Sequence, residues 1–342
     1  MDRMSRRTLA AGLGALAISG CDGEHEQERV RGVLYGRAVS VTPPRSPWDD
    51  QWSYFRGRLA AEPTIRMEYF NRGETGGEEQ QMFDLRRGRA MLAGLSLQGL
   101  SSIVPELTIA MAPFVFQTQA EVDYVYDRHL FEVFRPLFRA KGLRLMQWVE
   151  VGWTNLYSNG PVRTPHDAVG RKLRGSPNRA AQLFLKAIGA DSVPLASTEI
   201  VPALQTGLIS GGLGGTVFHF FSTRDYASDF TLTRHSYDTG AIVANASWLS
   251  QATPRQRQAL ESAWMSSVQA RASVRNLTES AIAQMKQRGI RVHELTPAER
   301  ALWVEACCGV GELLVREIGG AAQDVYDAIK AGRTEYAARG RA

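Results

Sequence analysis

Strand-like and helix-like segments alternate along the chain after about residue 32, and this order constrains the fold more than any other feature. Strand patterns occupy residues 33–41, 64–70, 90–95 and 143–149, and helical patterns occupy 48–60, 78–87 and 122–140. Such alternation favours an α/β fold with largely parallel strands. With 342 residues, of which 44% are apolar, the chain suffices for one large domain or two of ordinary size.

Helix starts are well marked in the last third of the chain. Thr253 and Thr296 each precede a proline, and Gln256 and Glu299 can complete capping boxes with them. Residues 254–288 contain no glycine and, after their first residue, no proline. They predict one helix of about 35 residues, about 50 Å long, which can brace two lobes at once. Two helices with an unmarked break are the alternative.

The first 20 residues have the pattern of an export signal. Basic residues precede an apolar segment at residues 9–18, which is too short to span a bilayer. The sequence Ser-Arg-Arg-Thr-Leu at residues 5–9 resembles a twin-arginine (Tat) signal, which usually means that the chain folds before it crosses the inner membrane. An ordinary Sec signal is the alternative.

A lipid anchor is predicted directly after this signal. Ile-Ser-Gly-Cys at residues 18–21 resembles a bacterial lipobox, so Cys21 is expected to be lipidated and to become the first mature residue. Asp22 resembles the signal that keeps a lipoprotein on the inner membrane. Residues 21–31 are charged and polar, as in a flexible tether. Several acyl chains on one cysteine anchor a protein stably, so we expect a periplasmic, lipid-anchored protein.

The sequence has none of the common motifs for catalysis or cofactor binding. HExxH, CxxC, Walker A and GxSxG are absent, and the six histidines have no metal-ligand spacing. The glycine cluster at residues 211–215 lacks the lysine and the spacing of a phosphate loop. The net charge of +5 is spread along the chain, which disfavours nucleic-acid binding. We therefore expect no metal, no cofactor and no enzymatic activity.

Short motifs follow one another in a specific order through the chain. They are SPW at 46–48, NRG and GGE within 71–78, VPEL at 104–107, APFVF at 112–116, PVRTP at 161–165, GRKLRGSP at 170–177, ALQTG at 203–207 and TLTRHSY at 231–237. In order and spacing they resemble the DctP-type solute-binding proteins of tripartite ATP-independent periplasmic (TRAP) transporters. The resemblance runs from about residue 33 to residue 330.

This resemblance implies a two-lobed, type II-like periplasmic binding protein with a long helix packed across both lobes. Its segments would be a first lobe of residues 32–151 and 240–279, a second lobe of residues 152–239 and 280–305, and a C-terminal helical segment of residues 306–342. The ligand would lie in the cleft between the lobes and be enclosed when they close.

Arg174 is the candidate that binds a carboxylate, because the carboxylate-binding arginine of the family falls on this position. Independently of the family, a guanidinium is a planar fork that pairs with both oxygens of one carboxylate and stays charged at ordinary pH. The alternative is a surface arginine in a basic turn, where Arg171 and Lys172 are the neighbours expected in solvent.

Two positions depart from the family pattern and change the expected ligand. Thr154 stands where many members have a second arginine, and Gly214 stands where many have an asparagine. The site thereby loses a charge and an amide and gains room. We therefore expect a small organic acid with one carboxylate and a larger, less polar body, rather than a dicarboxylate or a sialic-acid-like ligand.

Aromatic residues near these positions are candidates to wall the body of the ligand. They are Trp48 from the first lobe and Trp153, Phe218, Phe220 and Phe221 from the second. Successive residues seldom share one face, so at most one of Phe220 and Phe221 should point into the cleft. His219 and His235 are candidate hydrogen-bond donors. Each of these side chains alternatively packs in the core.

These residues predict a receptor in which ligand binding shifts the population from an open to a closed arrangement of the lobes. A ligand that touches both lobes stabilises the closed arrangement over the open one. By the resemblance, membrane permease subunits would recognise the closed form and import the ligand. Two alternatives remain: a lipoprotein that presents its closed form to a signalling receptor, and an enzyme built on the same scaffold.

Overall fold

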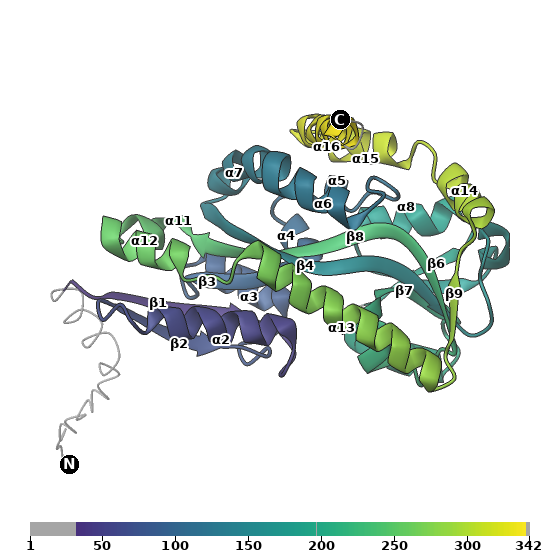
Figure 1. Ribbon diagram of the computed structural model, residues 1–342, viewed down its shortest axis with the longest axis horizontal. Coiled ribbons are helices and arrows are strands. Elements are labelled where there is room, and N and C mark those ends of the chain that lie inside the picture. The colour runs from purple at the N-terminus through teal and green to yellow at the C-terminus, as the bar shows by residue number, and fades with distance from the viewer. Residues whose placement is uncertain (1–31, 196, 340–342) are drawn as a thin grey trace, which may run out of the picture.

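One mixed sheet of nine strands runs through the computed structural model, which describes residues 32–195 and 197–339. The strand order is β2-β1-β3-β8-β4-β7-β5-β6, and β9 pairs with β8 outside this path. The strands are β1 (Leu34–Ser40), β2 (Ile65–Phe70), β3 (Leu92–Ser96), β4 (Leu143–Ser158), β5 (Lys172–Gly175), β6 (Asp191–Pro194), β7 (Gly211–Gly215), β8 (Asp229–Asn245) and β9 (Arg291–Glu294). Helices flank this sheet, so the predicted α/β fold is confirmed (Figure 1).

The helices follow the strands in alternation over the first half of the chain. The α-helices are α2 (Pro47–Leu59), α3 (Glu78–Arg86), α4 (Leu97–Ser101), α5 (Leu107–Ala110), α6 (Gln119–Val125), α7 (Phe131–Ala140), α8 (Arg179–Ala187), α9 (Ile200–Gln205), α10 (Thr216–Phe218), α11 (Ala246–Ser250), α12 (Pro254–Ser262), α13 (Ser267–Gln287), α14 (Pro297–Ala306), α15 (Val310–Ile318) and α16 (Ala322–Arg339). Short π- and 3₁₀-helical turns are η1 (Tyr126–Leu130), η2 (Pro165–Ala168), η3 (Ser197–Glu199) and η4 (His219–Thr223). The capping boxes expected at Thr253 and Thr296 are confirmed.

The shorter strands of each lobe pair in parallel, whereas the long strands β4 and β8 pair antiparallel with each other and with one neighbour in each lobe. β1 is parallel to β2 and β3, and β5 is parallel to β6 and β7. The pairs β3–β8, β4–β8 and β4–β7 are antiparallel, because β4 leads the chain into the second lobe and β8 brings it back. The expectation of largely parallel strands therefore holds for the shorter strands but misses the antiparallel pairs of β4 and β8.

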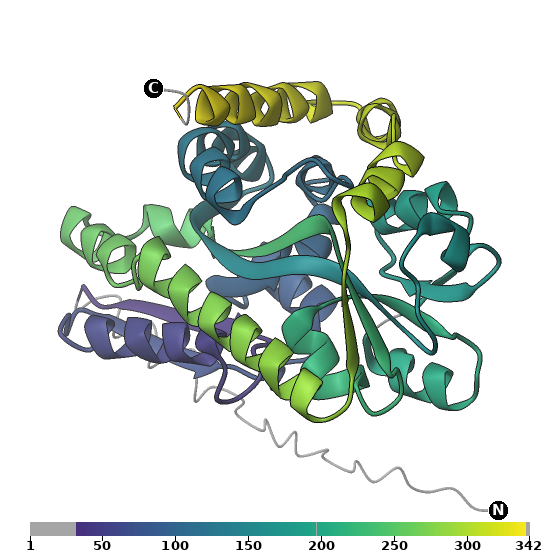
Figure 2. The same cartoon turned by 45° about the vertical axis from the view of Figure 1, so that its right-hand side comes forward.

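The long strands β4 and β8 carry the sheet from one lobe into the other (Figure 2). β3 pairs with the C-terminal part of β8, whereas β7 pairs with the C-terminal part of β4. The β4–β8 register shifts between Glu150 and Gly152, and Gly152 has a φ of +109°, which glycine adopts without strain. An extra residue of this kind bends and twists its strand. The bulge therefore marks where the two lobes meet.

The prediction of one helix over residues 254–288 is wrong, and the alternative of two helices is correct. The side chain of Ser266 caps the start of α13, after a break that follows α12. In this break Trp264 stacks on Phe55 of α2, with ring centroids 3.8 Å apart. Packing of this ring against the first-lobe core interrupts the helix. α13 is still about 32 Å long, and it contacts α2 in the first lobe and β9 in the second, so it crosses both lobes.

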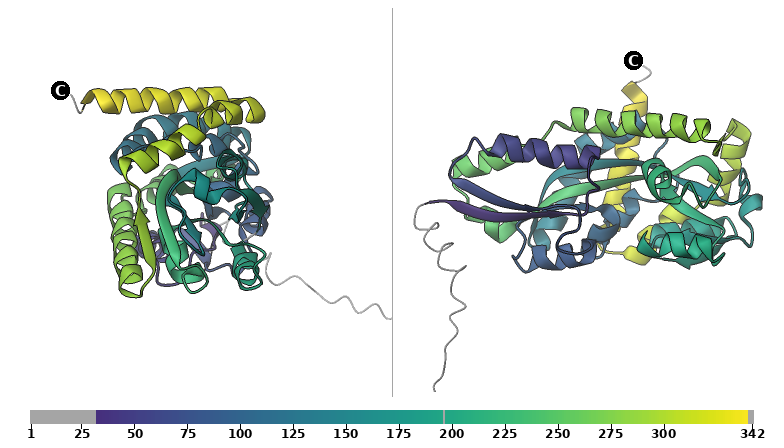
Figure 3. Two further views of the ribbon diagram at one scale, coloured as in Figure 1. Left: turned by 90° about the vertical axis from the view of Figure 1, so that its right-hand side faces the viewer. Right: turned by 90° about the horizontal axis from the view of Figure 1, so that it is seen from below.

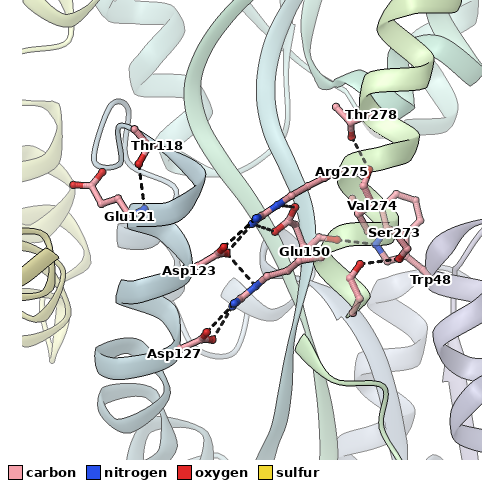
Figure 4. A network of polar contacts seen from close by, with 12 residues as sticks. Trp48, Thr118, Glu121, Asp123, Asp127, Glu150, Ser273, Val274, Arg275 and Thr278 are labelled. Carbon is pink, nitrogen blue, oxygen red and sulfur yellow. Dashed lines mark hydrogen bonds and ion pairs between the residues drawn. The ribbon is translucent and has the colours of Figure 1, made fainter. Parts of the chain in front are cut away.

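Two arginines attach α13 to the sheet and to α6 beside the bulge (Figure 4). Arg275 makes two hydrogen bonds with Asp123, at 2.9 and 2.7 Å, and two with Glu150 of β4, also at 2.9 and 2.7 Å. Arg271 binds Asp127 at 2.7 Å through both terminal nitrogens. Bidentate pairs of this type fix orientation as well as distance. The crossing helix is therefore held at the point where the lobes meet.

The C-terminal helices pack across α5 to α8 (Figure 3). α16 contacts α5, α6 and α7, and α15 contacts α5 and α8. Trp303 of α14 is fully buried and donates its indole N–H to the carbonyl of Arg163 at 2.8 Å. The exact residues that bound each lobe remain a prediction.

The predicted Tat signal, the lipobox at Cys21 and the tether at residues 21–31 lie outside the described residues. Within the ranges that the structure does describe, no helix has the length and apolar character needed to cross a membrane.

Candidate functional site

A cavity of about 480 Å³ lies between the lobes. It opens at the carboxyl ends of parallel strands: Val41 follows β1, Ser96 ends β3, Ser176 follows β5 and Gly215 ends β7. This edge is where open α/β sheets commonly bind ligands. The cavity therefore lies where a small molecule can touch both lobes at once.

Six of the seven predicted binding residues line this cavity, namely Trp48, Thr154, Arg174, Gly214, Phe218 and His235. The expectation for the seventh, Trp153, is corrected. Its ring packs edge-on against Tyr237, with ring centroids 4.8 Å apart, and it is not part of the cavity wall. Successive residues of a strand point to opposite faces of the sheet, so Trp153 faces away when Thr154 faces the cavity.

Arg174 is a buried cation on β5, with 6% of its surface exposed. Its Nε donates to the carbonyl of Leu195 at 3.0 Å, and its Nη1 donates to the carbonyl of Leu213 at 3.4 Å. These bonds orient the guanidinium and leave the hydrogens of Nη2 for another acceptor. Burial lowers the pKa of Arg174, but a guanidinium stays charged in proteins. The surface-arginine alternative is therefore wrong.

The second-lobe wall offers Arg174 no opposite charge. Across the two described ranges of the chain, no carboxylate lies within ion-pairing distance of this guanidinium, and its only hydrogen-bond acceptors there are two backbone carbonyls. A buried charge without a counter-charge is costly. The arrangement suits an anion that arrives from the cavity.

Glycines of β7 allow close packing around Arg174. A Cβ atom on Gly212 would lie 2.8 Å from the Cβ of Arg174 and 2.5 Å from the hydroxyl oxygen of Tyr157. A Cβ atom on Gly214 would lie 3.0 Å from the ring of Phe218. Phe218 therefore fills part of the room that was expected at Gly214.

The two candidate histidines have different surroundings. His235 lines the cavity and stacks on Phe184, with ring centroids 3.8 Å apart, and its Nδ1 lies 2.8 Å from Thr233 Oγ1. Burial lowers the pKa of His235 to about 3, so the ring is neutral at pH 7. His219 instead stacks on Phe230 in the core, 4.5 Å between centroids, and takes no part in the wall. The expectation that His219 donates to a ligand is therefore corrected.

Aromatic residues line both sides of the cavity. Phe220 is buried, whereas its neighbour Phe221 is 65% exposed and contributes to the cavity wall. This confirms that only one of the two faces the cleft. On the first-lobe side, Trp48 donates its indole N–H to the carbonyl of Glu150 at 2.8 Å, which fixes the ring beside the bulge (Figure 4).

Two carboxylates of the wall, Glu78 and Asp238, were not predicted from the sequence. Glu78 starts α3 and accepts hydrogen bonds from the backbone N–H and the hydroxyl of Ser96, both at 2.7 Å. Asp238 lies on β8 opposite Gly152, and its Oδ1 is buried with no hydrogen-bond partner among the described residues. Burial, together with the charge of Glu78, raises the pKa of Asp238 to about 7.

The described residues contain no group of three or more His, Cys, Asp or Glu side chains arranged to hold a metal ion. The cavity wall instead combines one cation, two carboxylates, hydroxyl groups and aromatic rings. Groups of this kind bind a small polar molecule by hydrogen bonds, charge and packing.

Comparisons with known proteins agree with this geometry. The family profile described as "Bacterial extracellular solute-binding protein, family 7" (DctP) matches residues 38–311. The C4-dicarboxylate-binding periplasmic protein DctP of Rhodobacter capsulatus is 22% identical, over 97% of this chain and 100% of its own length. The ectoine-binding periplasmic protein TeaA of Halomonas elongata is 23% identical, over 81% of this chain and 83% of its own.

Solved structures show the same fold. A TRAP periplasmic solute-binding protein of Roseobacter denitrificans, with bound β-D-glucuronate, superposes with a TM-score of 0.80 at 20% identity. The match covers 87% of this chain and 99% of that one. At 20% identity the likeness establishes the two-lobed fold but does not identify the ligand of this protein.

Proposed function

The chain belongs to family 7 of the bacterial extracellular solute-binding proteins, the DctP family, and from this premise we propose that it captures an organic acid with one carboxylate. Members of the family are periplasmic substrate-binding proteins of TRAP transporters and not enzymes. The protein is accordingly a periplasmic solute-binding receptor for small acids. Its own cavity residues argue for the finer ligand class.

One observation carries the proposal: Arg174 is a buried cation in the cavity wall with no carboxylate partner among the described residues. The backbone carbonyls of Leu195 and Leu213 hold the guanidinium in place before any ligand arrives. A ligand carboxylate therefore gains charge-assisted hydrogen bonds without having to order the arginine first.

The residues around Arg174 favour one carboxylate over two. Thr154 and Gly214 give the second-lobe wall no second cation at these two positions. Phe218, Phe221 and Leu213 present apolar surface to the same space. A body that packs against these side chains is stabilised by the apolar area it buries, about 25 cal/mol for each Å². Related proteins are named for C4-dicarboxylate and for ectoine, so the family accommodates different ligand bodies.

Closure of the lobes gives the ligand-bound protein a conformation that a partner can distinguish from the ligand-free one. A ligand that contacts Arg174 on one wall and Trp48 on the other binds the closed form better than the open form. Shifting the ratio of closed to open protein from 1:99 to 99:1 requires the ligand to bind the closed form more favourably by about 5.5 kcal/mol. We propose that TRAP permease subunits recognise the closed form and take up the ligand. A sensing role would use the same closure, and no feature of the described residues favours it.

The test is a thermal-shift screen of small organic acids, followed by calorimetry of the hits on the wild type and on Arg174→Ala. Loss of a buried charged hydrogen-bond partner should weaken binding about 100-fold or more. Lys172→Ala is the matched control, because Lys172 is an exposed cation on the same strand. It should leave the affinity unchanged within about twofold. Equal affinities of the wild type and Arg174→Ala would contradict the site assignment.

We also propose that Cys21 carries a lipid that anchors the receptor to the inner membrane, since residues 18–21 resemble a lipobox. Cys21→Ala should move the protein from the membrane fraction into the soluble periplasmic fraction, because membrane binding depends on the acyl chains. Fractionation of cells that express each form measures this directly. An unchanged distribution would refute the anchor and leave the proposed ligand binding untouched.

A further inference from the structure

The cavity wall carries two acidic side chains that capture of a carboxylate does not use, one from the first lobe and one from the place where the lobes meet. Glu78 starts α3 and Asp238 lies on β8, and both line the cavity that Arg174 lines from β5. A wall with two carboxylates repels a second anionic group on the ligand. Arg174 therefore favours an anionic group at one end of the ligand, whereas Glu78 and Asp238 disfavour an anionic group at the other end.

Glu78 is fixed before any ligand arrives. Its two carboxylate oxygens accept the backbone N–H and the hydroxyl of Ser96 at 2.7 Å each. These donors are neutral, so they orient the carboxylate without cancelling its charge. Throughout the described ranges, neither Glu78 nor Asp238 lies within ion-pairing distance of a Lys, Arg or His side chain. The part of the cavity beside Glu78 and Asp238 therefore keeps its negative potential.

Asp238 is the less satisfied of the two. Its Oδ1 is buried and has no hydrogen-bond donor among the described residues. The Thr239 backbone donates a hydrogen bond to this carboxylate, but a buried oxygen without a donor is costly, and neither the apolar body of a ligand nor a second carboxylate would relieve that cost. A nitrogen that carries hydrogen and positive charge would relieve it, and would also meet the neighbouring charge of Glu78.

We infer that the ligand is a zwitterion, whose carboxylate faces Arg174 and whose protonated nitrogen faces Asp238 and Glu78 across the cavity. This inference rests on the proposed function and refines the body of the ligand. The ligand then contacts Arg174 of the second lobe through its carboxylate and Glu78 of the first lobe through its nitrogen, so both ends favour the closed arrangement. The aromatic side chains between the walls pack against the carbon framework that separates them.

The test compares three series of probes by isothermal titration calorimetry: ω-amino carboxylates, n-alkanoates and α,ω-dicarboxylates of roughly three to eight carbons, sizes that a cavity of about 480 Å³ accommodates. For the optimal chain length, the ω-amino carboxylate should bind at least about tenfold more tightly than the alkanoate or dicarboxylate. In Asp238→Asn this preference for the ω-amino carboxylate over the alkanoate should vanish. Asp327→Asn, on the exposed surface of α16, is the matched control and should keep the preference.

The dependence of affinity on pH gives a second readout that needs no variant. A ligand cation favours ionised Asp238, so affinity for the ω-amino carboxylate should rise with pH up to about 8. Over this range His235 is already neutral and Arg174 stays charged. An affinity that falls instead would mean that protonated Asp238 donates to a neutral ligand oxygen, which contradicts the zwitterion.

The outcomes separate this inference from the proposed function. If alkanoates or dicarboxylates bind as tightly as the ω-amino carboxylates, and Arg174→Ala abolishes that binding, the zwitterion is refuted and the acid receptor stands. If Arg174→Ala leaves the binding of all three series intact, or if no series binds to the wild type, both proposals fail.

Discussion

Two charged residues of the cavity, Arg174 and Asp238, differ in the partners that surround them. On the second-lobe wall, Arg174 is held by the carbonyls of Leu195 and Leu213, in a place where glycines let the strands pack closely. Where β8 passes between the lobes, opposite Gly152, Asp238 keeps a buried oxygen with no hydrogen-bond partner among the described residues. Arg174 is an oriented cation, whereas Asp238 is a carboxylate that accepts a hydrogen bond from the Thr239 backbone but has one oxygen without a donor. Among the described residues, neither side chain has a group of opposite charge within ion-pairing distance.

A second carboxylate on the same strand shows what an ordinary structural ion pair looks like here. Asp229, at the start of β8, is fully buried and pairs with Arg291 and His293. Burial opposes its ionisation, but hydrogen bonds from Arg291, His293 and Ser228 lower the pKa of Asp229 to about 2. The pKa of Asp238 is instead raised to about 7 by burial. Asp229 is therefore paired with opposite charge, whereas the charged groups of the cavity have only neutral hydrogen-bond partners among the described residues.

The largest effect is expected from Gly212→Ala, which damages the second-lobe wall. The added Cβ atom would lie 2.5 Å from the hydroxyl oxygen of Tyr157 and 2.9 Å from the carbonyl oxygen of Arg174. Because backbone atoms cannot yield as a flexible side chain can, the free energy of unfolding should fall by about 3 kcal/mol. Displacement of Arg174 should also abolish binding of organic acids. Urea denaturation and calorimetry measure the two effects.

The control for this substitution is Gly57→Ala. Gly57 is exposed on α2, and a Cβ atom there would meet no other atom within 4 Å. Alanine is favoured over glycine in a helix, so this variant should be as stable as the wild type or more stable by up to about 1 kcal/mol. If Gly212→Ala behaves like Gly57→Ala, close packing around Arg174 is not required.

A smaller effect of opposite sign is expected from Asp238→Asn, where β8 passes between the lobes. The pKa of Asp238 is higher in the folded protein than in the unfolded chain, so ionisation costs stability as pH rises from about 4 to above 7. The variant cannot ionise, so it should be more stable than the wild type by about 2 kcal/mol near pH 8. This advantage should disappear toward pH 4. Urea denaturation at several pH values measures it.

Asp229→Asn supplies the matched comparison on the same strand. The pKa of Asp229 is lowered, so its ion pairs stabilise the fold above about pH 4 and are lost as pH falls toward 2. The variant should therefore be less stable than the wild type near pH 8, by about 3 kcal/mol. If both variants destabilise the protein equally, the carboxylate of Asp238 is a structural group and not one kept for a ligand.

The order of strands and helices could be predicted because apolar spacing and caps are local signals. The Thr-Pro starts of α12 and α14 are examples. The break before α13 could not be predicted, because Trp264 leaves the helix to stack on Phe55, far away in the sequence. The length of β4 was missed for a similar reason, since its second half is defined by pairing with β7 and β8.

Arg174 could be predicted because a motif surrounds it and because the chemistry of a carboxylate calls for a guanidinium. Because side chains alternate along a strand, Trp153 must point away from the cavity that its neighbour Thr154 lines, but this follows only once β4 is known to extend that far. Glu78 and Asp238 left weaker signals: one ends the GGE motif, and the other interrupts a strand of mostly uncharged residues. Only the folded arrangement brings both carboxylates to the cavity of Arg174.

A crystal structure of the protein with its best-binding organic acid tests the central claim most directly. We predict closed lobes and carboxylate oxygens within about 3 Å of the terminal nitrogens of Arg174. A ligand carboxylate bound away from Arg174, or a ligand bound outside the cavity between the lobes, would contradict the account.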